Sequence, residues 1–251
     1  MLLKEFDLNG KVAVIIGHNR SWNKIFVKAL VQSGADVVAV VNNVTNMDDV
    51  MEEAERLGHR GIALSTDITK LEDVQNTVEV IMSRFGKIDI LINNATVELV
   101  KPFTDSTENE WRNMMNNNLI GVMLWCQIVG KHMLERKRGR IINIISGLSV
   151  RGLPNNTVYC ATMGAIHQFT KALALEWARQ NVRVNAIAYG HMSSEENNEE
   201  VISDRLVRHI PLRRLGKSYD LAGPLVYLSS DTSDYITGET FFVDGGLISH
   251  G

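Results

Sequence analysis

The sequence lacks most features that mark membrane, disulfide-rich or nucleic-acid-binding proteins. Its only cysteines, Cys126 and Cys160, are too few for a disulfide framework and favour a reducing, cytoplasmic location. It has no run of about 18 consecutive apolar residues, so we expect no contact with a membrane. The net charge of −3 argues against nucleic acid as a partner, because phosphate contacts need a basic surface. The first residues, MLLKEFDLNGK, lack the apolar core and cleavage site of a signal peptide.

The sequence also lacks the motifs of metal-dependent and hydrolytic enzymes. None of its seven histidines is spaced from another histidine, a cysteine or a carboxylate as metal ligands are, so we expect no metal. Ser146 does not lie in a Gly-x-Ser-x-Gly elbow, and hydrolase chemistry therefore has little support. With 45% hydrophobic and 22% charged residues, the composition is that of a globular protein.

Short apolar runs alternate with segments of helical periodicity along the whole chain. Uninterrupted β-branched runs between helices are typical of a parallel sheet that is covered on both faces. We therefore predict one doubly wound α/β domain over residues 1–251. The predicted strands are Val12–Ile16, Val37–Val41, Ile62–Leu64, Ile88–Ile92, Arg140–Ile145 and Val182–Ile187.

Two local signals predict the limits of helices. Thr107 and Glu110 have the spacing of a capping box, which predicts a helix start at this point. Gly139 follows a basic run and is expected to close a helix before the next strand.

Five motifs, in order and at the expected spacing, resemble the short-chain dehydrogenase/reductase family from about Leu8 to Gly246. They are Asn93-Asn94-Ala95 after the fourth strand, Asn118-Leu119-Ile120-Gly121, Gly139 to Ile144 leading to Ser146, Tyr159 thirteen residues after Ser146, and Ile236 to Glu239 with Val243 to Gly246. The resemblance implies a Rossmann-like fold with a seven-stranded parallel sheet. It also implies a nicotinamide cofactor and a site formed by Asn118, Ser146 and Tyr159.

The glycine-rich turn that holds the cofactor pyrophosphate in this family is altered here. After the first strand the family has three glycines, and only Gly17 remains, while Ser21 and Asn23 replace the other two and Trp22 adds a bulky ring. The second glycine lets the backbone approach the phosphates, and the third lets the helix pack on the strand. We therefore expect the cofactor turn to be blocked.

The family's catalytic lysine is also missing. Four residues after Tyr159, where the family has the lysine, this chain has Met163, which carries no charge and donates no hydrogen bond. An unassisted tyrosine has a pKa of about 10, so roughly one in a thousand is ionised at pH 7. We expect Met163 to be a core-filling residue and Tyr159 to be poorly suited to acid/base catalysis.

Smaller departures point in the same direction. Val41 stands where members that use NAD have an acidic residue, and Tyr189-Gly190 replaces the family's Pro-Gly. Asp67 and Asn93 remain at positions that contact the cofactor in the family. Ser193 to Asp204 falls where the family has its substrate lid.

The selective loss of cofactor residues predicts a degenerate family member that supports an active relative. In this interpretation the chain binds no cofactor itself and is the non-catalytic subunit of a hetero-oligomer, as known in the family. Its partner is an active paralogue that holds NAD, most simply in a heterotetramer. Family members assemble through two long helices, here Glu108 to Arg138 and Tyr159 to Gln180. One substrate class that the resemblance suggests is a hydroxyacyl-CoA of anaerobic aromatic degradation.

Two alternatives remain open. In the first, the chain is an active NAD(P)-dependent oxidoreductase that holds its cofactor in an altered pose and uses Tyr159 and Ser146. Alternatively, it is a binding or sensor protein that uses the nucleotide cleft for a nucleotide or an acyl-CoA.

Overall fold

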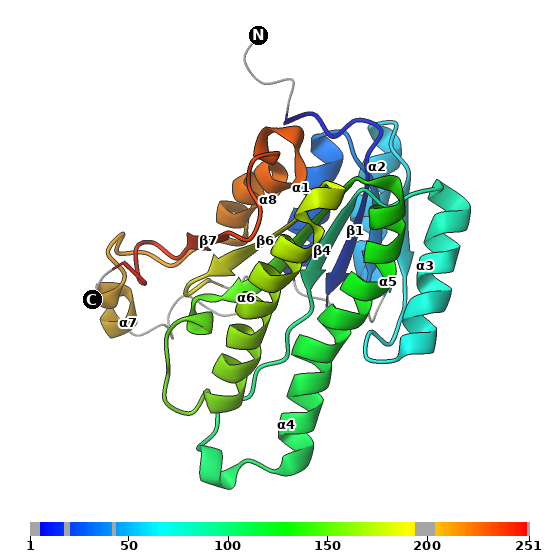
Figure 1. The fold of residues 1–251 in the computed structure, drawn as a ribbon. Coiled ribbons are helices and arrows are strands. Elements are labelled where there is room, and N and C mark those ends of the chain that lie inside the picture. The colour runs from blue at the N-terminus through cyan, green and yellow to red at the C-terminus, as the bar shows by residue number, and fades with distance from the viewer. Residues whose placement is uncertain (1–5, 18–20, 42–43, 194–203, 250–251) are drawn as a thin grey trace.

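Seven parallel strands form the centre of the protein, whose computed structural model describes residues 6–17, 21–41, 44–193 and 204–249 (Figure 1). The strands are β1 (Val12–Gly17), β2 (Asp36–Val40), β3 (Gly61–Leu64), β4 (Ile90–Asn94), β5 (Gly139–Ser146), β6 (Val182–Tyr189) and β7 (Thr240–Val243). Their order in the sheet is β3-β2-β1-β4-β5-β6-β7, and every pairing between neighbours is parallel. The predicted fold class is confirmed: this is a single Rossmann-like domain with a seven-stranded sheet.

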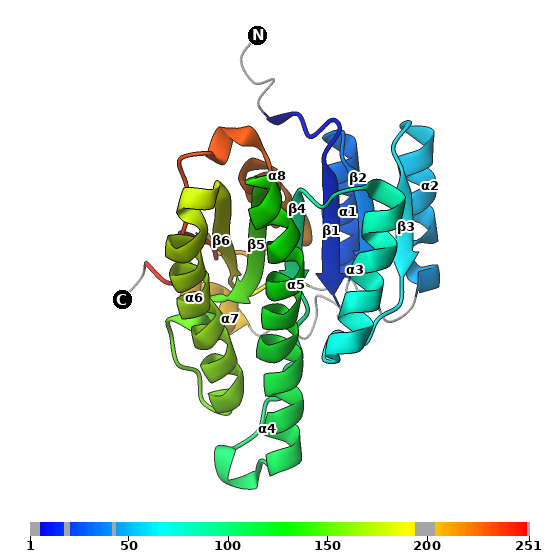
Figure 2. The ribbon, with the colours of Figure 1, turned by 45° about the vertical axis from the view of Figure 1, so that its right-hand side comes forward.

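Helices cover both faces of the sheet (Figures 1 and 2). The helices are α1 (Ser21–Gln32), α2 (Asp48–Arg56), α3 (Leu71–Phe85), α4 (Glu108–Met115), α5 (Gly121–Arg136), α6 (Thr157–Trp177), α7 (Asp204–His209) and α8 (Ala222–Ser229). Helices α3, α5 and α6 pack on one face, whereas α1, α2 and α8 pack on the other. Helix α4 extends beyond the carboxyl ends of the strands and continues the line of α5 (Figure 2).

Alternate residues of a strand contribute to two separate apolar cores. Val12 and Val14 of β1 belong to the core under α3, α5 and α6, whereas Ala13 and Ile15 belong to the core under α1, α2 and α8. All of these side chains are completely buried. Because both faces of each strand are covered, the sequence shows continuous apolar runs rather than alternation.

The order of the strands places the site. The chain runs outward from β1 to β2 and β3 and then returns to β4, which pairs with the other side of β1. The loops that leave β1 and β4 therefore diverge and open a crevice at the carboxyl ends of the two strands. In open α/β sheets ligands bind at such a switch point.

The structure refines the predicted boundaries. Thr107 and Glu110 form the predicted capping box at the start of α4. Gly139, however, does not close a helix: α5 ends at Arg136, Lys137 takes the left-handed conformation with φ of 51°, and Gly139 begins β5. The predicted helix Glu108 to Arg138 consists of α4, a π-turn over Asn116–Ile120, and α5. The predicted helix Tyr159 to Gln180 consists of α6 and the 3-10 turn Ala178–Gln180.

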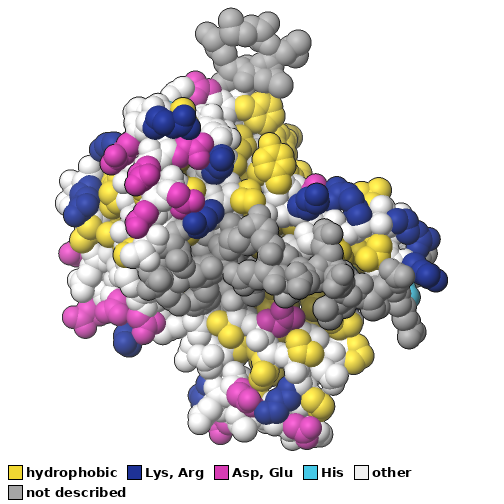
Figure 3. All heavy atoms as spheres, turned by 180° about the vertical axis from the view of Figure 1, so that it is seen from behind, with side chains coloured by type: hydrophobic (Ala, Val, Ile, Leu, Met, Phe, Trp, Pro, Cys, Tyr) yellow, Lys and Arg dark blue, Asp and Glu magenta, His cyan; other side chains and the backbone are white. Residues whose placement is uncertain are grey.

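Charges of both signs are interspersed on the surface. On the upper left of the face seen from behind, acidic and basic side chains lie next to one another, whereas its right-hand side shows mainly basic side chains (Figure 3). Lys24 of α1, for example, pairs with Asp49 of α2 at 2.9 Å.

No helix within the described residues is long and apolar enough to cross a membrane.

Candidate active site

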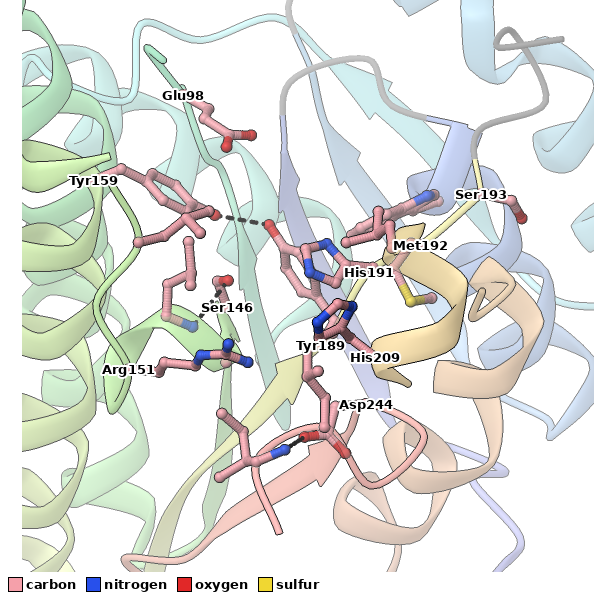
Figure 4. A pocket seen from close by; sticks show the side chains of 18 residues that line it. Glu98, Ser146, Arg151, Tyr159, Tyr189, His191, Met192, Ser193, His209 and Asp244 are labelled. Carbon is pink, nitrogen blue, oxygen red and sulfur yellow. Dashed lines mark hydrogen bonds between the residues drawn. The ribbon is translucent and has the colours of Figure 1, made fainter. Parts of the chain in front are cut away.

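A cavity of about 520 Å³ lies at the carboxyl ends of β5 and β6 (Figure 4). Its walls come from the start of α1, the ends of β5 and β6, the first turn of α6, helix α7 and the segment after β7. The cavity contains Ser146 and Tyr159, two of the three residues that the resemblance assigned to the family's site and that we expected to be vestigial here. Their catalytic role remains a prediction.

Tyr159 points into the cavity from the first turn of α6 and meets a second tyrosine there. Its hydroxyl lies 2.9 Å from the hydroxyl of Tyr189, the last residue of β6 (Figure 4). The two residues are only 3% and 8% exposed, respectively, so little water competes for this hydrogen bond. The indole of Trp22 packs edge-on against the Tyr189 ring, with the centroids 4.8 Å apart.

Ser146 ends β5 beside this tyrosine pair. In the sheet it is the register partner of Tyr189 on β6. Its hydroxyl oxygen accepts a hydrogen bond from the backbone N–H of Leu148 at 3.2 Å. The contact caps the short turn Gly147–Ser149 and orients the serine, whose own O–H can still be donated into the cavity.

Asn118 lies in the π-turn between α4 and α5. Its side-chain amide accepts from the N–H of Val97 at 2.7 Å and donates to the carbonyl of Val97 at 2.8 Å. The same nitrogen donates to the Thr162 hydroxyl of α6 at 3.2 Å. Asn118 therefore ties the chain that leaves β4 to α6 and supports the helix that carries Tyr159.

Met163 is a core residue, as predicted. It is 1% exposed and belongs to the apolar cluster under α3, α5 and α6. It is not among the described residues that line the cavity. An apolar side chain thus occupies the family's lysine position.

The altered glycine turn lies between β1 and α1. Asn23 is completely buried, and its Oδ1 accepts a hydrogen bond from Nδ2 of Asn94 at 2.6 Å. A Cβ atom on Gly17 would lie 2.2 Å from Nδ2 of Asn23, so only glycine fits beside this amide. In the part of the chain that the structure describes, Nδ2 of Asn23 has no hydrogen-bond partner. Ser21 begins α1, and residues 18–20 and the Ser21 side chain lie outside the described part.

The other two predicted cofactor residues have local partners. Asn93 of β4 donates to Oδ1 of Asn143 at 2.8 Å, and Asn143 donates to the Thr170 hydroxyl at 2.9 Å, which forms a buried polar ladder between β4, β5 and α6. Asp67 accepts from the backbone and hydroxyl of Thr69, and these bonds lower the pKa of its carboxyl. Neither side chain lines the cavity, as far as the described residues define it.

Three basic side chains also point into the cavity, around the tyrosine pair and Ser146 (Figure 4). They are Arg151 after β5, His191 after β6, and His209 at the end of α7. Burial lowers the pKa of His191, and the positive charge of Arg151 lowers it further. The sequence analysis missed these residues. Arg151 and His191 both follow the carboxyl end of a predicted strand, and this position could have revealed them.

Glu98 and Asp244 complete the polar wall (Figure 4). Asp244 accepts from the N–H groups of Gly246 and Ile248 at 2.9 and 2.8 Å and so holds the C-terminal turn against the cavity. A Cβ atom on Gly190 would lie 2.7 Å from the Asp244 backbone, which explains the retained glycine after Tyr189. Most of the predicted lid, Ser193 to Asp204, falls on residues 194–203, which lie outside the described residues.

Known proteins resemble this chain over nearly its full length. A family profile described as enoyl-(acyl carrier protein) reductase matches residues 18–248. 2-Dehydro-3-deoxy-D-gluconate 5-dehydrogenase of Escherichia coli (strain K12) is 34% identical over 254 residues, covering 99% of this chain and 100% of that protein. 3-Oxoacyl-(acyl-carrier-protein) reductase of Thermotoga maritima is 32% identical over 243 residues, covering 96% of this chain and 99% of that protein. A gluconate 5-dehydrogenase from Burkholderia cenocepacia J2315, solved in complex with NADP and tartrate, matches 99% of both chains at 32% identity with a TM-score of 0.92.

These findings overturn the prediction that the chain binds no cofactor. The Burkholderia protein carries NADP within the same fold. The prediction failed because the nucleotide crevice depends on the order of the strands around β1 and β4, and the replacement of two glycines does not change that order. The buried, unpartnered Nδ2 of Asn23 fits the same conclusion, because a donor beside Gly17 suits an anionic phosphate. The relatives are dehydrogenases and reductases, and nothing in them indicates a degenerate or cofactor-less subunit. The chain belongs to the short-chain dehydrogenase/reductase family.

Proposed function

We propose that this protein is an NAD(P)-dependent oxidoreductase that interconverts a hydroxyl and a keto group on a polyhydroxy carboxylic acid. The observation that carries the proposal is a single cavity that combines hydroxyl groups with basic groups (Figure 4). Tyr159 and Ser146 supply the hydroxyls, and Arg151, His191 and His209 supply the basic wall.

The two hydroxyls suit the proton chemistry of this reaction. In the reducing direction the Tyr159 O–H donates its proton to the carbonyl oxygen of the substrate, and in the oxidising direction the Tyr159 oxygen accepts it. The Ser146 hydroxyl donates a hydrogen bond to the same substrate oxygen and stabilises the charge that develops there. Both side chains are buried and held by hydrogen bonds, so they need little reorganisation during the reaction.

The cofactor residues lie at the β1–β4 crevice. The start of α1, with the buried Nδ2 of Asn23, would hold the pyrophosphate, because free N–H groups at a helix N-terminus favour anions. When bound, the nicotinamide supplies or accepts the hydride. Trp22, which lines the cavity at this end, shields the reacting side from water.

The basic wall suggests the substrate class. A guanidinium pairs with a carboxylate in a bidentate manner, and the imidazoles of His191 and His209 can donate hydrogen bonds to hydroxyl groups. The names of the relatives agree with this assignment, since the Escherichia coli and Burkholderia proteins are dehydrogenases of gluconate derivatives.

The test is reduction of 5-keto-D-gluconate by the purified protein with NADH or NADPH, followed by loss of the reduced nicotinamide's absorbance. We expect turnover by the wild type and a decrease of about 10²- to 10⁴-fold in Tyr159→Phe. Tyr219→Phe, which changes an exposed tyrosine, is the matched control and should keep full activity. Tight binding of nucleotides or acyl-CoA without turnover of any keto acid would instead favour the sensor alternative.

A second candidate function is a supporting subunit in a hetero-oligomer with an active paralogue. Met163 at the lysine position favours it, as does an apolar groove of about 530 Å³ along α5 and α6. Ile120 and Met123, each 40% exposed, lie on this groove. Purification from native cells at endogenous expression tests this candidate. Elution as a homo-oligomer with activity of its own would exclude it, and co-elution with an intact family member would support it.

A further inference from the structure

Tyr189 brings a second phenol to the catalytic tyrosine. It ends β6 at the position where the family has proline, which has no hydroxyl. The hydroxyl oxygens of Tyr189 and Tyr159 lie 2.9 Å apart and form a hydrogen bond in which either hydroxyl can be the donor. This distance lies within the ordinary range of an O–H···O hydrogen bond.

The surroundings hold Tyr189 in this position. The ring of Trp22 packs edge-on against its ring, and its backbone is paired on both sides, with β5 and with β7. On β5 its register partner is Ser146, so both catalytic hydroxyls adjoin Tyr189. A side chain fixed by ring packing and strand pairing loses little entropy when it donates a hydrogen bond.

The chain needs such a donor because of Met163. A tyrosine that gives up a proton must carry a negative charge, and the side chain four residues further along α6 is a buried thioether that cannot stabilise it. A neutral donor that hydrogen-bonds an anion favours the ionised form.

We propose that Tyr189 is a positioning residue that donates its hydroxyl proton in a hydrogen bond to the Tyr159 oxygen and stabilises the phenolate, in place of the family's lysine. This inference rests on the proposed function. In the reducing direction, hydride from NAD(P)H forms the new C–H bond, and the Tyr159 proton forms the O–H bond of the alcohol. The Tyr159 phenolate then accepts the Tyr189 hydrogen bond until water in the cavity returns a proton to it.

Other charged groups share the cavity and act on both tyrosines. They are Glu98, Arg151, His191, His209 and Asp244. Tyr189→Phe leaves all of them in place and keeps the ring that packs on Trp22. A difference between the wild type and this variant therefore reports on the hydroxyl of Tyr189 alone.

The direct test is an ultraviolet titration of tyrosinate in the free protein, without substrate or cofactor. A hydrogen-bonded pair releases its protons in two coupled steps, and the first occurs at a lower pH than the ionisation of the remaining tyrosine in either single variant. We expect this early step in the wild type and in Tyr219→Phe, whose phenol is 76% exposed. It should be absent from both Tyr189→Phe and Tyr159→Phe. An early step that persists in either of these two variants overturns the inference, so one of them decides the question if the other folds poorly.

Kinetics provide a second readout. In Tyr189→Phe we expect kcat at neutral pH to fall about ten- to hundred-fold, as for the loss of a hydrogen bond to a charged group. KM should change less than about two-fold, and the alkaline fall of the pH–rate profile for reduction should move to higher pH. An unchanged kcat and pH profile overturns the inference. The two proposals fail separately: absence of turnover in a wild type that shows the early titration step contradicts only the proposed function.

Discussion

The side-chain amide of Asn94 on β4 donates a 2.6 Å hydrogen bond to Oδ1 of Asn23 on α1. The bond joins the two strand-helix connections that form the nucleotide crevice and turns Nδ2 of Asn23 toward Gly17. Asn23, which replaces a family glycine, is thus held in place by a buried hydrogen bond from Asn94. This bond fixes the position of the Nδ2 donor of Asn23 beside Gly17.

The first prediction concerns this donor. Asn23→Asp retains the oxygen that accepts from Asn94 but removes the N–H donor and adds a negative charge. We expect the dissociation constants of NADH and NADPH to rise at least about ten-fold, because a hydrogen bond to a charged phosphate is lost. Fluorescence titration measures this, with Asn116→Asp at an exposed position of the π-turn as the control. Equal affinities in wild type and Asn23→Asp would contradict the assignment of the cofactor residues.

The second prediction concerns Met163. Because its side chain is 1% exposed among apolar neighbours, Met163→Lys must bury an ammonium group. We expect the free energy of unfolding to fall by about 1–3 kcal/mol, without a gain in cofactor affinity. Urea denaturation measures the change, and Met163→Leu should remain within about 1.5 kcal/mol of the wild type. A fully stable and more active Met163→Lys would show that the lysine reaches the cavity.

The third prediction concerns the pH dependence of substrate binding. The pKa of His191 lies below its usual 6.5 because of burial and the charge of Arg151, so the imidazole is neutral at pH 7. As the pH falls through this lowered pKa, His191 gains a positive charge that attracts a carboxylate. We therefore expect KM for a polyhydroxy acid to decrease as the pH falls below 6.5. Initial-rate kinetics test this, and His191→Asn should remove the decrease. Should Arg151→Gln leave KM unchanged, the basic wall would not bind the substrate.

The fourth prediction concerns the stability of the fold in acid, at the amino ends of the strands. Burial raises the pKa of Asp231, but hydrogen bonds from Lys11 and Arg140 outweigh burial and lower the pKa to about 2. A lowered carboxyl pKa stabilises the fold above its ordinary value of 3.8, and this contribution is lost as the pH falls toward 2.

The Asp231 side chain is 44% exposed, so solvent screening reduces its contribution to about 1 kcal/mol at pH 7. Asp231→Asn should be less stable than the wild type by this amount at pH 7 and equally stable near pH 2. Denaturant unfolding at a series of pH values measures the difference. Asp105→Asn, on an exposed turn, should follow the wild-type curve. A constant difference at all pH values would assign the loss to packing rather than to charge.

The local pattern predicted the fold more fully than the site. The run Val12 to Ile16 predicted β1 to within one residue, because a strand buried on both faces must be apolar at every position. Thr107 and Glu110 likewise form their capping box within four consecutive residues. Lys137 shows the limit of such signals, since it ends α5 in the left-handed conformation, whereas Gly139 was expected to close this helix.

Only the part of the site that contains Ser146 and Tyr159 followed from a sequence motif. Ser146 and Tyr159 lie in the cavity, as their spacing suggested. Asn93 matched a motif equally well, yet its side chain belongs to an internal polar ladder. The absence of the family's glycines and lysine predicted a chain without cofactor. The sequence does not reveal that Asn23 faces Gly17 or that Asn94 donates a hydrogen bond to Asn23, because these contacts form only in the folded protein.

The sequence by itself determined six of the seven strands, the main helices and the family, because neighbouring residues show which face of a strand or helix is buried. Only the tertiary structure decided that Tyr189 meets Tyr159 and that Arg151, His191 and His209 converge on one cavity. These side chains come from separate elements, and Tyr159 and Tyr189 are 30 positions apart in the chain. Their contact depends on how α6 packs against the sheet, which no local periodicity encodes.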